Sequence, residues 1–259
     1  MKKICFIVLC VCWTGMVNAS PFQVTPMRLE LESGSNIGNV TVYNSGDKTL
    51  NIQVKAKAWS QQEETGEDQL VKTDELVFFP KIFKIPAHGQ KNIRVGFQGE
   101  VVDKERSYRL FIRELPVKKP GLSGAQFVLQ ISMPVFIYPA GSSKPRKPTM
   151  QGIEVHDGAL VLKAVNPSAR YYSLNKIEVV GSHEENTVFE HEQGGWYVLS
   201  GATRLFPLGI DQQQCLKADS LKLTGHVLLA QSEAGDTSQV QFPLTSALCK
   251  QIHRAKKNK

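Results

Sequence analysis

The sequence lacks the motifs that catalysis or metal binding would require. It has no GxSxG nucleophile elbow, no glycine-rich phosphate loop and no HExxH helix. Its six histidines show no metal-ligand spacing. Its carboxylates gather in loops such as 63–68 and 184–185, which is typical of solvated surface. These absences argue against an enzyme, and they imply neither a cofactor nor a metal.

Long apolar runs are missing after the N-terminus. Residues 1–19 combine Lys2 and Lys3 with an apolar run and a small-residue cleavage site that ends at Ala19, a pattern typical of a signal peptide. The run is too short to span a bilayer. We therefore expect an exported chain that begins near Ser20, with a formal net charge of +5 from 29 Lys and Arg against 24 Asp and Glu.

Cysteine is also scarce, because only Cys215 and Cys249 remain after cleavage of the signal peptide. Disulfides persist in exported proteins, so a Cys215–Cys249 bridge is favoured over two free thiols. Two cysteines alone are too few for a structural zinc site, which needs four ligands.

Positive charge is moderate and dispersed along the chain. The dense basic runs lie at 144–148 and 254–259, and aromatic residues interleave neither of them. Together with export, this argues against nucleic acid as a partner. We interpret the two runs as a solvated linker and a solvated tail.

Helical periodicity is nearly absent, whereas short alternating strands separated by turn residues recur from residue 22 onward. About seven strands in the first 120 or so mature residues match the count of an immunoglobulin-like sandwich. The sequence therefore predicts an all-β chain with two such domains. Their expected ranges are 20–138 and 149–250, with a linker at 139–148 and a basic tail at 251–259.

One stretch, 127–138, has an unusually long and uniform apolar face. The alternating residues on that face are Phe127, Leu129, Ile131, Met133, Val135 and Ile137. The face can belong to an ordinary core strand, or part of it can be offered to another molecule.

Two arginines stand in otherwise apolar strands, Arg28 and Arg109. A guanidinium near a core is costly unless it is paired. Each can pair with an internal carboxylate such as Glu30, Glu105 or Glu114, or it can await an incoming anion.

Residues 103–116, DKERSYRLFIRELP, resemble a segment of the PapD-like periplasmic chaperones of the chaperone–usher pathway. Arg28, Asn44, Trp59 and the turn at 86–89 fall in family order, and the similarity extends over nearly the whole chain. The resemblance implies two immunoglobulin-like domains in an L- or boomerang-shaped arrangement, and a location in the periplasm.

The same resemblance implies the partners. Such chaperones lend a strand to pilus subunits that lack one, and an outer-membrane usher then receives the complex. The donated residues here would be Phe127, Leu129, Ile131 and Met133, with the chain returning to its own sandwich from Pro134 onward. An unoccupied strand also allows a self-capping dimer.

The chain departs from the better-known branch of the family at two anchor positions. Pro134 stands where that branch has a lysine, and Arg109 stands where it has an aromatic residue. This pattern resembles the archaic or alternative branch, and it implies that Arg28 and Arg109 bind the carboxylate of the subunit, with Arg113 as an alternative to Arg109. Glu114 matches a carboxylate that fixes the angle between the domains, although its basic partner there corresponds to Tyr138 here.

An alternative interpretation is a two-domain pilus or adhesin subunit. Such a subunit should carry an alternating N-terminal extension and, commonly, a disulfide in its first domain. Only Ser20–Gln23 precede the first expected strand, and the first domain has no cysteine.

Overall fold

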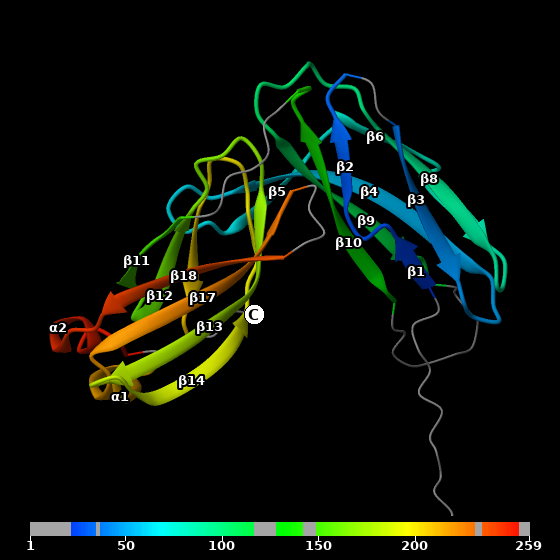
Figure 1. The fold of residues 1–259 in the computed structure, drawn as a ribbon. Coiled ribbons are helices and arrows are strands. Elements are labelled where there is room, and N and C mark those ends of the chain that lie inside the picture. The colour runs from blue at the N-terminus through cyan, green and yellow to red at the C-terminus, as the bar shows by residue number, and fades with distance from the viewer. Residues whose placement is uncertain (1–21, 35–36, 117–127, 142–148, 231–234, 254–259) are drawn as a thin grey trace, which may run out of the picture.

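Alternating apolar residues build two pairs of β-sheets in the computed structural model, which describes residues 22–34, 37–116, 128–141, 149–230 and 235–253 (Figure 1). The predicted all-β fold class with two immunoglobulin-like domains is confirmed. The expected signal peptide, Phe127, most of the expected linker and residues 254–259 lie outside the described residues.

The first domain consists of a four-stranded and a six-stranded sheet. The first has the order β1-β3-β8-β6, and the second has the order β2-β10-β9-β4-β5 with β7 also paired to β4. The strands are β1 (Phe22–Thr25), β2 (Leu29–Glu32), β3 (Ile37–Asn44), β4 (Leu50–Gln61), β5 (Asp68–Lys72), β6 (Leu76–Phe79), β7 (Ile82–Ile85), β8 (Gln90–Phe97), β9 (Arg106–Glu114) and β10 (Gln130–Tyr138).

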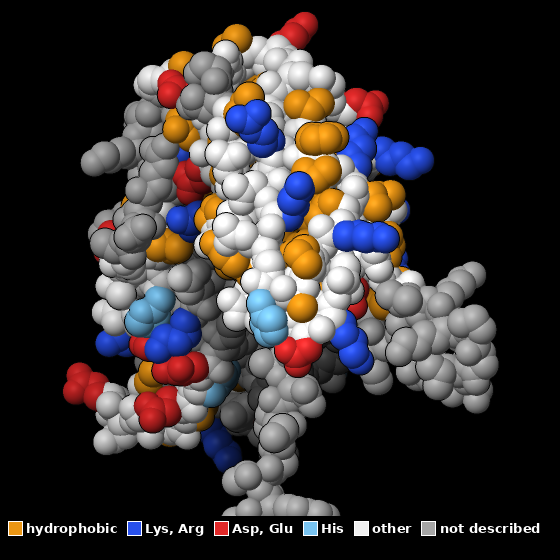
Figure 2. All heavy atoms as spheres, turned by 90° about the vertical axis from the view of Figure 1, so that its right-hand side faces the viewer, with side chains coloured by type: hydrophobic (Ala, Val, Ile, Leu, Met, Phe, Trp, Pro, Cys, Tyr) orange, Lys and Arg blue, Asp and Glu red, His pale blue; other side chains and the backbone are white. Residues whose placement is uncertain are grey.

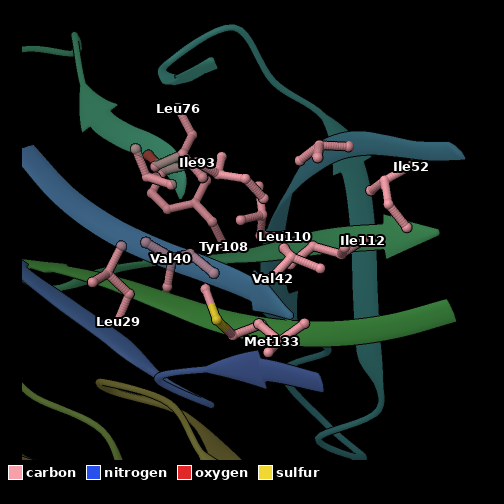
Figure 3. Close-up of a cluster of buried hydrophobic side chains, with 14 of the residues drawn as sticks. Leu29, Val40, Val42, Ile52, Leu76, Ile93, Tyr108, Leu110, Ile112 and Met133 are labelled. Atoms are coloured by element: carbon pink, nitrogen blue, oxygen red, sulfur yellow. The ribbon is translucent and has the colours of Figure 1, made fainter. Parts of the chain in front are cut away.

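The core of this domain lies between the inner faces of its two sheets (Figure 3). Because side chains alternate along a strand, every second residue points inward, as Val40 and Val42 do on β3. Leu110 and Ile112 of β9 and Met133 of β10 complete the cluster from the other sheet, and all five are essentially inaccessible to solvent.

The strand that we expected to contain Arg28 is divided in the structure. β1 pairs with β3 in one sheet, whereas β2 pairs in parallel with β10 in the other. Pro26 lies between them and has no N–H to donate to a ladder, which favours a break at this point. Arg28 therefore sits immediately before a strand and not in the middle of one.

The second domain consists of a three-stranded sheet, β11-β12-β16, and a five-stranded sheet, β14-β13-β17-β18 with β15 also paired to β13. Its elements are β11 (Thr149–His156), β12 (Ala159–Val165), β13 (Tyr172–His183), β14 (Asn186–Gly194), β15 (Tyr197–Val198), β16 (Thr203–Pro207), α1 (Gln212–Lys217), β17 (Ser220–Leu229), β18 (Asp236–Pro243) and α2 (Ser246–Cys249).

Two short helices, α1 and α2, lie together at one end of this domain. A disulfide between Cys215 and Cys249 joins them, with 5.5 Å between the two Cα atoms. Asp211 caps α1 through a capping box with Gln214. Helices of four and six residues are too short to leave a 3.6-residue pattern, so the sequence did not predict them.

The two domains meet along one side and diverge toward the lower edge of Figure 1, where β10 and β2 lie on the side of the first domain that faces the second. Within the described residues, no helix is long and apolar enough to cross a membrane.

Candidate functional site

Half of β10 has an unpaired edge. β9 pairs with β10 from Gln130 to Ile137, and the Glu114 N–H extends this contact to the Leu129 carbonyl at 2.9 Å. On the other side of β10, β2 pairs only from Val135 to Tyr138. Within the part of the chain that the structure describes, no strand pairs with that side of Gln130–Pro134. An open edge of this kind is a template for a strand from another chain.

The side chains along this open edge differ in their burial. Leu129 and Ile131 are half-buried and pack against the margin of the first domain's core, whereas Gln130 and Ser132 are exposed on the opposite face. Met133, which we expected among the donated residues, is instead fully buried in the core of its own domain (Figure 3). The open apolar part of the edge is therefore shorter than the sequence suggested.

Arg28 lies where this open edge ends. It directly precedes Leu29, which is the partner of Val135 at the start of the β2–β10 ladder. Its Nε lies 3.0 Å from Glu30 Oε1, so the arginine is paired with an internal carboxylate. About a quarter of its side chain remains exposed, at 24%.

Arg109 lies on the outer face of β9, opposite Pro134, and is only 6% exposed. Its guanidinium lies 3.7 Å from the ring centroid of Trp59, and the rings of Trp196 and Tyr197 also border it, at 5.1 and 5.5 Å. Burial lowers the pKa of Arg109, and the charge of Asp68 offsets part of that effect. Its Nη2 has no hydrogen-bond partner among the described residues.

A cluster of aromatic rings from both domains connects the two arginines. Phe136 of β10 stacks on Tyr171 at 3.7 Å, and Tyr197 lies 5.6 Å from Tyr171. Arg28 lies 5.8 Å from the Tyr171 ring, while Arg109 contacts Tyr197. The structure thus brings Arg28 and Arg109 to the border of one aromatic cluster beside the open edge.

A buried network of charged residues joins the domains behind this cluster. Arg170 of the second domain lies 3.0 Å from Glu30 and 3.6 Å from Glu105, and its guanidinium is 4.0 Å from the Tyr138 ring. The Tyr171 N–H donates to Glu105 at 2.8 Å. Each of these contacts crosses between residues that are far apart in the sequence.

Glu114, the residue that we expected between the domains, lies elsewhere. It is at the opposite end of β9 from Arg106, paired in register with Ile52 of β4. Glu105 immediately precedes β9 and holds the interdomain position instead. Glu105 could have been found from the sequence, because it stands within the family-like segment 103–116. Nothing in the local sequence pattern pointed to Arg170.

A second set of polar contacts holds the domains together beside β5. Gln61 donates to the Tyr197 carbonyl at 2.8 Å and accepts from the Leu199 N–H at 3.0 Å. Asp68 accepts from Arg204 and from the Trp196 indole N–H, at 3.0 and 2.7 Å. Both domains also line a cavity of about 500 Å³, which borders Trp59 and Glu105. Polar contacts therefore join the two domains beside β5 as well as at Glu30 and Arg170.

Burial raises the pKa of Glu105 from its ordinary 4.5 to about 8, despite the opposing effects of the Tyr171 N–H and Arg170. The folded protein therefore binds this proton more tightly than the unfolded chain does. We expect the contribution of Glu105 to the free energy of unfolding to be largest below about pH 4.5 and to be lost as the pH rises toward about 8. The slope within this window is at most about 1.4 kcal/mol per pH unit.

Urea unfolding between about pH 5 and pH 8 measures this slope. Glu105→Gln keeps a similar shape and removes the titration, so its free energy of unfolding should fall less, or rise more, over this range than that of the wild type. Equal slopes in the two proteins would contradict the shifted pKa.

A separate apolar surface covers part of the other sheet of the first domain, over β3, β6 and β8 (Figure 2). Ile37, Val77 and Phe79 are exposed there and line a groove of about 490 Å³ together with Gly96 and Arg94. This sheet does not contain β10, so the groove is distinct from the open edge and its arginines.

The first domain matches a known protein family. Residues 21–143 match the family profile described as "Pili and flagellar-assembly chaperone, PapD N-terminal domain". This segment belongs to that family. The predicted resemblance to PapD-like pilus chaperones is thereby confirmed. A comparison with curated protein sequences finds no match.

Solved structures with this fold cover most of the chain. A chain of the CsuC–CsuE chaperone–tip adhesion subunit complex, from the archaic chaperone–usher Csu pili of Acinetobacter baumannii, has a TM-score of 0.63 at 20% identity, and the match covers 85% of this chain and 98% of that one. The YadV chaperone matches with a TM-score of 0.59 at 16% identity, covering 87% and 100%. The Salmonella enterica SafA pilin–SafB chaperone complex gives 0.55 at 15% identity, covering 88% and 98%.

Proposed function

We propose that the chain is a periplasmic chaperone that captures pilus subunits by donor-strand complementation. The observation that supports this most directly is the open edge of β10 at Gln130–Pro134, with Leu129 and Ile131 half-buried beside it. A subunit that lacks a strand can pair its main chain with this edge and cover the apolar side chains. Two of the structurally similar proteins are complexes of a chaperone with a tip subunit or a pilin.

We further propose that Arg28 and Arg109 bind the C-terminal carboxylate of the subunit. Arg28 lies where the open edge ends, and 24% of its side chain is exposed although its Nε contacts Glu30, so an incoming anion can reach the guanidinium. Nη2 of Arg109 has no hydrogen-bond partner in the described part of the chain, and it lies where aromatic rings exclude water. A charge-assisted hydrogen bond is stronger in such surroundings than in water.

The remaining proposals follow from the family and from the sequence. Residues 1–19 would direct export, the domains would span 20–138 and 149–250, and the complex would pass to an outer-membrane usher. The missing lysine at Pro134 and the presence of Arg109 favour the archaic or alternative branch. Without a subunit, two copies could cap each other at the open edge.

Co-expression with the pilus subunits encoded alongside this chain tests the proposal. We expect a soluble complex of one chaperone with one subunit, measured by native mass spectrometry, and an insoluble or degraded subunit when the chaperone is absent. Subunits that fold equally well without it, and that form no complex with it, would contradict the proposed function.

A further inference from the structure

Glu30 contacts Arg28 and also two residues of the second domain. Its Oε1 lies 3.0 Å from Arg28 Nε and also accepts a 2.6 Å hydrogen bond from the Tyr171 hydroxyl. Its Oε2 accepts from Arg170 Nη2 at 3.0 Å. Two of these three partners belong to the second domain, so a carboxylate on β2 is held in place by residues more than a hundred positions away.

The contact with Arg28 fixes the direction of its guanidinium. When Nε is engaged by a carboxylate at 3.0 Å, the planar group can no longer rotate freely about its last bonds. The Tyr171 ring, 5.8 Å from the guanidinium carbon, restricts it further, and Tyr171 is itself stacked on Phe136 at 3.7 Å. Burial and the charge of Glu30 raise the pKa of Tyr171, so its hydroxyl keeps its proton and remains a donor.

The net charge of Arg28, Glu30 and Arg170 favours the binding of an anion. Arg28 and Arg170 carry two positive charges against one negative charge on Glu30. Glu105 also lies near Arg170, at 3.6 Å, but burial raises its pKa to about 8, so it is mostly protonated at neutral pH and the group is net positive. Glu30 is only 12% exposed, whereas Arg28 is 24% exposed. An incoming carboxylate therefore meets the arginine before it meets the glutamate.

We propose that Glu30 is a positioning residue for carboxylate recognition by Arg28, and that Tyr171 and Arg170 of the second domain hold it in position. Recognition of a chain terminus by the first domain thus depends on the docked second domain. This inference rests on the proposed function of Arg28.

The test uses a labelled peptide of about ten alternating valine and threonine residues, made once with a free C-terminal carboxylate and once with an amide. Binding of both forms to the full chain is measured by fluorescence anisotropy. Tyr171→Phe keeps the ring stacking and removes the donor to Glu30. We expect it to weaken carboxylate binding by about fivefold to tenfold, with no change for the amide.

Tyr172→Phe is the matched control. This adjacent tyrosine is also buried in the second domain, and its hydroxyl contacts the Val165 carbonyl at 3.5 Å and not Glu30. It should leave the binding of both peptides unchanged.

Variants of Glu30 separate positioning from simple charge neutralisation. Glu30→Ala removes a negative charge but also frees Arg28, so we expect weaker carboxylate binding. Glu30→Gln keeps an acceptor for Arg28 and Tyr171 but turns an amide NH2 toward Arg170 Nη2, so it should recover only part of the binding. Stronger carboxylate binding by Glu30→Ala would overturn the inference, as would equal losses for carboxylate and amide in Tyr171→Phe. If Arg28→Ala does not reduce the preference for the carboxylate, the anchor itself is wrong, which is a different failure.

Discussion

Ile131→Asp is expected to abolish capture of a pilus subunit. The side chain lies on the apolar face of β10, within the stretch whose edge is unpaired. A charged carboxylate carried into the apolar groove of a subunit loses its hydration without gaining a partner. We expect at least about a hundredfold loss of affinity, equivalent to about 2.7 kcal/mol. Because Ile131 is only half-buried in its own domain, the variant should stay folded.

Co-purification of the subunit with tagged chaperone measures this loss, and the thermal midpoint of the free chaperone checks its fold. Ser132→Asp is the matched control, because it places the same charge one residue further along the same edge, on the opposite and exposed face. It should retain much more binding. Normal co-purification with Ile131→Asp would rule out β10 as the donated strand.

Arg28→Ala is expected to cost roughly 2–5 kcal/mol of subunit binding, because truncating one side of a desolvated charge pair leaves the other charge without a partner. The fold should tolerate the change. Glu30 keeps its contacts with Arg170 and Tyr171, so no buried carboxylate is left alone. Isothermal titration of subunit against wild-type and variant chaperone gives the difference.

Arg113→Ala serves as the control, since this arginine is exposed on the same domain, on the same face of β9 as Arg109. It should bind the subunit as the wild type does. If instead Arg113→Ala weakens binding as Arg28→Ala does, Arg113 and not Arg109 completes the anchor with Arg28. Arg109→Ala is less informative, because removal of a guanidinium that is packed against Trp59 would also disturb the domain interface.

The strands and the fold class could be predicted from the sequence because they depend on a local signal. Inward-facing residues recur every second position, and this pattern reaches from β3 to β18 without help from tertiary contacts. A Cys215–Cys249 disulfide could also be proposed, because only these two cysteines lie outside the expected signal peptide.

The interface could not be predicted in this way. Glu30 and Arg170 are 140 residues apart, and no local sequence pattern around either residue indicates that they form a pair. The surroundings of Arg109 show the same limit. The sequence presented a buried arginine in need of a carboxylate, whereas the structure supplies three aromatic rings, two of them from the second domain. Which group compensates a buried charge depends on tertiary packing. The alternation of apolar and polar residues along a strand does not encode that packing.

The position of β2 also determines how long a guest strand can be. A strand that pairs with Gln130–Pro134 on the unpaired side runs in line with β2, whose ladder to β10 begins at Leu29 and Val135. If the strand of the subunit runs parallel to β10, as β2 does, its C-terminal residue lies next to Arg28. Residues beyond that point would collide with β2. In the proposed complex, a subunit with a few extra C-terminal residues would therefore have to displace β2 or shift its register, so we expect it to bind more weakly.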